Sequence, residues 1–152
     1  KLYLFKSFDK KPLSQEEIEN VFSVEISSNE KKLFDFLLEK KDSFIVDFFS
    51  NYSGEIKNPN SFVFNATNQF VVLHRMFTTE DKSFSFLKKD WPPILGKNRE
   101  KFIRNMKFWK KSSIEEALFI LRETELKIRN NSKLSTKRII SFAFLNICLL
   151  NN

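Results

Sequence analysis

The chain has 152 residues and a net charge of +7, and it contains 19 Phe but only 2 Gly, 1 Cys and 1 His. Gly54 and Gly96 lie too far apart for a glycine-rich phosphate loop or a dinucleotide-binding motif. One Cys and one His are too few for a usual zinc site. We therefore expect no catalytic residues, no cofactor and no bound metal, and the composition favours a binding or assembly role.

The same composition gives no sign of secretion and predicts no membrane partner. One Cys cannot form an intramolecular disulfide, so nothing indicates an oxidising compartment. No signal peptide is expected after Lys1, and we interpret the chain as a fragment of a longer protein. The longest apolar run, residues 139–150, is 12 residues long, whereas a spanning helix needs about 20.

Charge divides the chain into two predicted domains, residues 1–90 and 91–152. The first carries 13 basic and 14 acidic residues, a net charge of −1, and the second carries 13 basic and 5 acidic residues, a net charge of +8. The change coincides with Trp91-Pro92-Pro93, where two prolines end any helix. We expect the domain boundary at this point.

The first unit is predicted to be almost entirely helical. Residues 1–5 are short and apolar, and they fit a strand or a helix end. A capping box at Ser14 and Glu17 predicts a short helix that ends near Phe22. Apolar residues spaced three and four apart predict three more helices, over residues 29–41, 42–54 and 61–77.

The second unit is predicted to be a three-helix or larger bundle, with helices over residues 94–110, 114–130 and 136–150. Ser113 and Glu116 form a second capping box. Ser135 is the expected cap of the last helix. The predicted fold class is therefore all-α: a small helical bundle followed by a second helical bundle.

Two chemically reactive side chains are expected to have structural roles. His74 is the only side chain that normally titrates near neutral pH, but it lies in the middle of a helix and no motif pairs it with a nucleophile. Cys148 lies in an apolar helix, where a thiol packs as a small hydrophobic group. The neighbouring carboxylates of Asp35 and Glu39 fit a solvated helix face.

A basic run over residues 97–111 is a candidate nucleic-acid contact. On one continuous helix, Lys97, Lys101, Arg104 and Lys111 share a face at spacings of four, three and seven, and Lys107 lies in the same run. Such a face could contact phosphates. It would equally suit a solvated surface or pairing with an acidic neighbouring subunit.

The last predicted helix is the strongest candidate for a subunit interface. Ten of the 12 residues over 139–150 are apolar, and a helix that is apolar on every side must be covered on every side. Either other helices of the chain cover it or partner subunits do. The predicted interface residues are Trp109, Phe142, Phe144, Leu145, Ile147 and Leu149.

Several short segments carry a family resemblance through their order. In the first unit they are Lys1 to Phe5, Leu13 to Val21, Leu33 to Asp42 and Phe70 to Phe77; in the second they are Trp91-Pro92-Pro93 before the basic helix, and Ser113 to Glu125. In this order they resemble the δ-subunit family of the bacterial DNA polymerase III clamp loader. The family usually has Asp and Lys where this chain has Glu125 and Arg129, a replacement that keeps both charges.

The resemblance implies that residues 1–90 form the helical lid of an AAA+-type subunit and that residues 91–152 form its collar. The implied partners are the δ′ and γ/τ subunits through the collar and the sliding clamp through an N-terminal domain outside this fragment. The δ subunit has no working ATP site, and contact with DNA would be indirect or weak. The implied function is clamp loading in DNA replication, as part of the DNA polymerase III holoenzyme, and the implied location is the bacterial cytoplasm.

Two other hypotheses stay open from the sequence. The first is a stand-alone helical nucleic-acid-binding domain that uses the basic residues over 97–111. The second is an enzyme with an unfamiliar carboxylate site, which no sequence feature favours.

Overall fold

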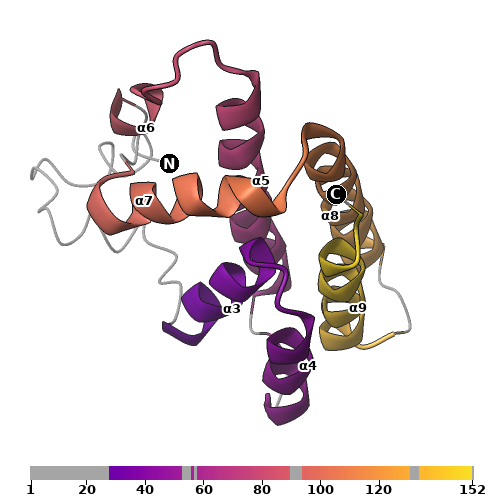
Figure 1. Ribbon diagram of the computed structural model, residues 1–152. Coiled ribbons are helices and arrows are strands. Elements are labelled where there is room, and N and C mark those ends of the chain that lie inside the picture. The colour runs from indigo at the N-terminus through magenta and orange to yellow at the C-terminus, as the bar shows by residue number, and fades with distance from the viewer. Residues whose placement is uncertain (1–27, 53–55, 57, 90–93, 131–133, 152) are drawn as a thin grey trace, which may run out of the picture.

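The computed structural model describes residues 28–52, 56, 58–89, 94–130 and 134–151 of the chain (Figure 1). Every regular element in these ranges is a helix, which confirms the predicted all-α class. The elements are α3 (Ser28–Leu38), α4 (Asp42–Asn51), α5 (Pro59–Thr78), α6 (Phe86–Lys89), α7 (Gly96–Asn105), the 3₁₀ helix η1 (Met106–Phe108), α8 (Lys111–Arg129) and α9 (Thr136–Cys148).

Some predicted features fall outside these ranges. They are the segment 1–5, the capping box at Ser14 and Glu17, the helix end at Gly54 and the Trp91-Pro92-Pro93 break.

The junction of α3 and α4 is sharper than the sequence predicts. Helix α3 ends at Leu38, because Lys40 adopts a left-handed conformation with φ of 55°. The amide of Lys41 donates back to the carbonyl of Phe36 at 2.9 Å, which satisfies a carbonyl of the last turn. Lys41 then occupies the N-cap position of α4.

Helix α5 is the longest helix of the described chain, with 20 residues. The Asn58 side chain accepts a hydrogen bond from the Ser61 amide at 3.3 Å, and Pro59 occupies the first turn, where its missing N–H is not needed. Helix α8 packs along α5, and α9 packs against α8 and α4 (Figure 1). Helix α8 is therefore held by α5, and α9 lies between α8 and α4.

One hydrophobic core joins helices from both predicted units. The ring of Phe144 on α9 lies 5.8 Å from Phe62, 6.1 Å from Phe49 and 6.5 Å from Phe34. These partners come from α5, α4 and α3, so one aromatic side chain of the second unit is surrounded by three helices of the first. The described helices on either side of residue 90 pack as one body.

The predicted continuous helix over residues 94–110 is wrong. Helix α7 ends at Asn105, η1 follows, and Trp109 is extended with φ of −131° and ψ of 147°. Helix α8 then begins at Lys111, so Ser113 lies inside it and is not its cap. The Ser113 hydroxyl donates to the carbonyl of Asn151 at 2.7 Å, which holds the described end of the chain against α8.

The start of α9 matches the predicted position, with Ser135 at its N-cap, although no side-chain cap hydrogen bond forms there. None of the helices in the described ranges has both the length and the apolar character needed to cross a membrane.

Candidate functional site

Three of the six predicted interface residues lie in the interior of this chain. Phe144 and Ile147 have no exposed surface and Trp109 is 3% exposed. Helices α3, α4 and α5 cover the side of α9 that carries Phe144. All three residues belong to the hydrophobic core of this chain. Leu145 is partly buried against the same core. Phe142 and Leu149 are exposed, at 69% and 67%.

Trp109 is held in the core by a specific hydrogen bond. Its indole N–H donates to the carbonyl of Leu38 at 2.8 Å, and its ring meets Phe70 edge to face at 5.0 Å. The ammonium group of Lys40 lies 4.4 Å from the ring centre. The prediction placed Trp109 on a continuous helix, whereas the break after η1 turns the residue inward.

The outer surface of α8 and α9 carries the most exposed aromatic side chains of the second unit. Phe119 is 62% exposed, Leu134 is 63% exposed, and with Phe142 they border a surface cavity of about 680 Å³. We call this surface the α8–α9 face. Its lining residues are Phe119, Ile120, Glu123, Thr124, Lys127, Leu134, Arg138, Ile139, Phe142, Ala143 and Asn146.

The sequence analysis did not identify Phe119 or Leu134. A signal for Phe119 exists, because Ile114, Ala117 and Leu121 form the buried stripe of α8 and Phe119 lies off that stripe. Leu134 precedes α9 and has no periodic signal of its own.

The five basic candidates do not form one continuous face. Lys97, Arg104 and Lys107 are exposed. Lys101 is half-buried, and its ammonium group forms an ion pair with the Asp35 carboxylate at 2.6 Å. Lys111 belongs to α8 and lies 3.8 Å from Glu115. The prediction of one basic face assumed a continuous helix over residues 97–111, and it is wrong because η1 and Trp109 separate α7 from α8.

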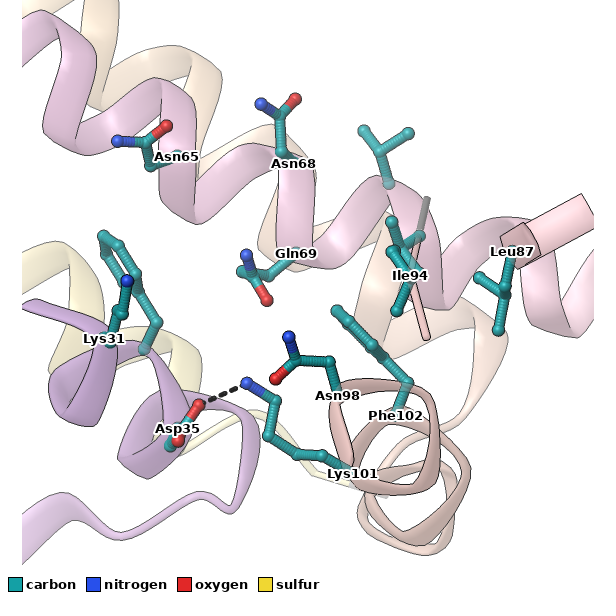
Figure 2. Close-up of a pocket in the computed structure, with 13 residues that line it drawn as sticks. Lys31, Asp35, Asn65, Asn68, Gln69, Leu87, Ile94, Asn98, Lys101 and Phe102 are labelled. Carbon is teal, nitrogen blue, oxygen red and sulfur yellow. Dashed lines mark hydrogen bonds and ion pairs between the residues drawn. The ribbon is translucent and has the colours of Figure 1, made fainter. Parts of the chain in front are cut away.

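A second cavity, of about 610 Å³, lies between α3, α5 and α7, and we call it the amide groove (Figure 2). Four amide side chains line it, namely Asn65, Asn68, Gln69 and Asn98. Its two lysines are Lys31 and Lys101, and its one carboxylate is Asp35. The apolar lining residues are Phe34, Val71, Val72, Leu87, Ile94 and Phe102. Sequence reasoning missed this groove because its three walls are far apart along the chain.

A backbone hydrogen bond holds together the two residues, Leu87 and Ile94, that form one end of the amide groove. The amide of Ile94 donates to the carbonyl of Leu87 at 2.6 Å, which ties the segment before α7 to α6. Leu87 is itself buried. Figure 2 shows Leu87 and Ile94 at the opposite end of the groove from Lys31 and Asn65.

The remaining titratable groups of interest have structural partners. His74 lies 3.4 Å from Glu115, a contact that links α5 to α8. Burial, and secondarily the nearby charge of Asp42, raises the pKa of the Cys148 thiol to about 12. Hydrogen bonds from Ser83 and Ser85 hold the pKa of Asp81 well below its usual range.

The described ranges contain no group of three or more His, Cys, Asp or Glu arranged to hold a metal ion. Comparison of the chain with protein-family models, curated proteins and solved structures finds no match.

Proposed function

We propose that this chain is an assembly module that binds another protein subunit through the α8–α9 face. The observation that carries the proposal is the exposure of Phe119, Leu134 and Phe142, each above 60%, around one surface cavity. Exposed apolar side chains that gather around one cavity are typical of protein-interaction sites. Burying one such Phe side chain in a complex contributes about 1.5–3 kcal/mol.

The resemblance to the δ-subunit family extends this proposal to clamp loading. In this form of the proposal, residues 91–152 act as a collar and the partners are the δ′ and γ/τ subunits. The α8–α9 face supports it, because a collar requires apolar helix surfaces that the chain itself leaves uncovered. The intact protein would then help place the sliding clamp on DNA for the replicative polymerase.

Assembly is better supported than nucleic-acid binding by the basic run. Two of the five basic candidates, Lys101 and Lys111, have carboxylate neighbours within the chain. The other three are divided between α7 and η1, which limits the continuous positive surface that they offer to phosphates.

Sedimentation of the full chain with clamp-loader subunits from the same genome tests the proposal. We expect association at micromolar concentration, and we expect a Phe119→Ala and Phe142→Ala double variant to lose it. Phe64→Ala is the matched control, because Phe64 is 61% exposed on α5 and does not line the α8–α9 face.

Two outcomes would contradict the proposal at different levels. If the wild-type chain binds no loader subunit but associates with itself through Phe142, the clamp-loader role is wrong and the assembly role is kept. If it sediments alone under all conditions, the assembly role is wrong as well.

A further inference from the structure

The amide groove carries solvent-accessible amide side chains on both of its long sides. Asn65, Asn68 and Gln69 lie on α5, and Asn98 lies on α7 (Figure 2). No hydrogen bond to any of these four side chains is present among the described residues. Each amide offers donors and an acceptor together, which is the combination that a peptide backbone requires.

The spacing of these amides matches an extended chain. Asn65 and Gln69 are four residues apart, so they lie on the same side of α5 and are separated by about 6 Å along the helix axis. Alternate residues of an extended strand are about 6.6–6.8 Å apart. Asn65 and Gln69 can therefore form hydrogen bonds with the backbone of alternate residues of a bound strand. Asn98 lies on the opposite wall of the groove.

The charge of the groove is positive at one end. Asp35 is paired with Lys101 at 2.6 Å, whereas Lys31 has no ion-pair partner in the described part of the chain. The remaining positive charge complements an acidic side chain. The opposite end, at Leu87 and Ile94, is apolar and complements an aliphatic side chain.

We infer that the amide groove binds an extended peptide segment that carries an acidic residue toward Lys31 and an aliphatic residue toward Leu87 and Ile94. The strand lies along α5 and exchanges backbone hydrogen bonds with Asn65 and Gln69. A single-stranded nucleic acid fits less well, because the Phe34 and Phe102 rings are only 3% exposed and offer no stacking surface. The inference does not depend on the proposed assembly function, since the groove and the α8–α9 face share no lining residue.

Selection from a linear octapeptide phage library on the full chain provides the probe. We expect enriched peptides with an acidic and an aliphatic position and with a two-residue period. Absence of enrichment, or a helical period of three and four, would overturn the inference.

The selected peptide, made synthetically and labelled, then tests the hydrogen bonds by fluorescence anisotropy. Methylation of the peptide nitrogen at alternate residues should loosen the Kd at least about tenfold, and methylation at the intervening residues should have little effect. Asn65→Ala and Gln69→Ala should each loosen the Kd about fivefold, within the range of one lost hydrogen bond.

The control variant is Asn60→Ala, which makes the same change at an exposed position of α5 that lines neither cavity and should leave the Kd unchanged. Alanine favours helices more than Asn or Gln does, so lost binding would not reflect unfolding of α5. An unchanged Kd in the Asn65 and Gln69 double variant would overturn the inference. The inference would also be overturned, in favour of nucleic acid, if the chain binds dT20 but no peptide and the double variant weakens the binding of dT20.

Discussion

Trp109 is the residue at which α3 and α5 meet the segment between α7 and α8. Its indole reaches the Leu38 carbonyl and its ring packs on Phe70, so one side chain is tied to two helices from earlier in the chain. Tryptophan suits this position because its large apolar ring can be buried while its N–H finds a partner. The sequence predicted Trp109 at an interface with a partner, whereas its position after η1 buries it inside this chain.

Cys148 gives a prediction about thiol reactivity. Because burial raises its pKa to about 12, from about 8.5 for a free thiol, the folded protein keeps it protonated at neutral pH. We expect the reaction with a disulfide reagent at pH 8 to be at least about 100-fold slower in the folded chain than in denaturant. Absorbance of the released thiolate measures the rate, and Cys148→Ser gives the background.

The raised pKa of Cys148 determines how the free energy of unfolding changes with pH. A thiol with a raised folded pKa contributes stability that is fully present below about pH 8.5 and is lost as the pH rises toward 12. The free energy of unfolding of the wild type should therefore fall relative to Cys148→Ser above pH 8.5. Equal rates of reaction with the disulfide reagent in the folded and the unfolded chain would contradict the burial of the Cys148 thiol.

Helix α9 has two different apolar sides. The side with Ile140, Phe144 and Ile147 has no exposed surface, whereas Phe142 is 69% exposed. Helix α9 is therefore both a core helix and the outer wall of the α8–α9 face.

A pair of alanine variants separates these two sides. Phe144→Ala should lower the free energy of unfolding by about 3–5 kcal/mol, because it leaves a cavity among Phe34, Phe49 and Phe62. Phe142→Ala should change it by less than about 0.5 kcal/mol, because it removes a side chain that is mostly in solvent. Denaturant titration measures both. Similar losses in the two variants would mean that Phe142 is also covered by this chain.

At the scale of the whole molecule, the shared core predicts cooperative unfolding. Among the described helices, the most extensive packing joins α5 to α8, across the predicted boundary at residue 90. We expect one transition in denaturant, with coincident midpoints for helical circular dichroism and for Trp109 fluorescence in a Trp91→Phe background. Two separate transitions would instead support independent units over 1–90 and 91–152.

The sequence predicted the helices better than their ends. The helix predicted from Ser61 begins two residues earlier, at Pro59, because the Asn58 side chain caps it and Pro59 fits its first turn. The capping box at Ser113 was misleading because α8 already begins at Lys111 and Ser113 is used for a contact with Asn151. The break after Asn105 had no glycine or proline to announce it, and it follows from burying Trp109 under Lys40 and against Phe70.

The sequence by itself determined that the described chain is helical and that its last helix is apolar all round, because both properties depend on residues three and four apart. Tertiary structure alone decided which side of that helix is covered, since the covering rings of Phe34, Phe49 and Phe62 come from helices far away in the sequence. It also decided where the amide groove lies, because α3, α5 and α7 meet only after the chain has packed.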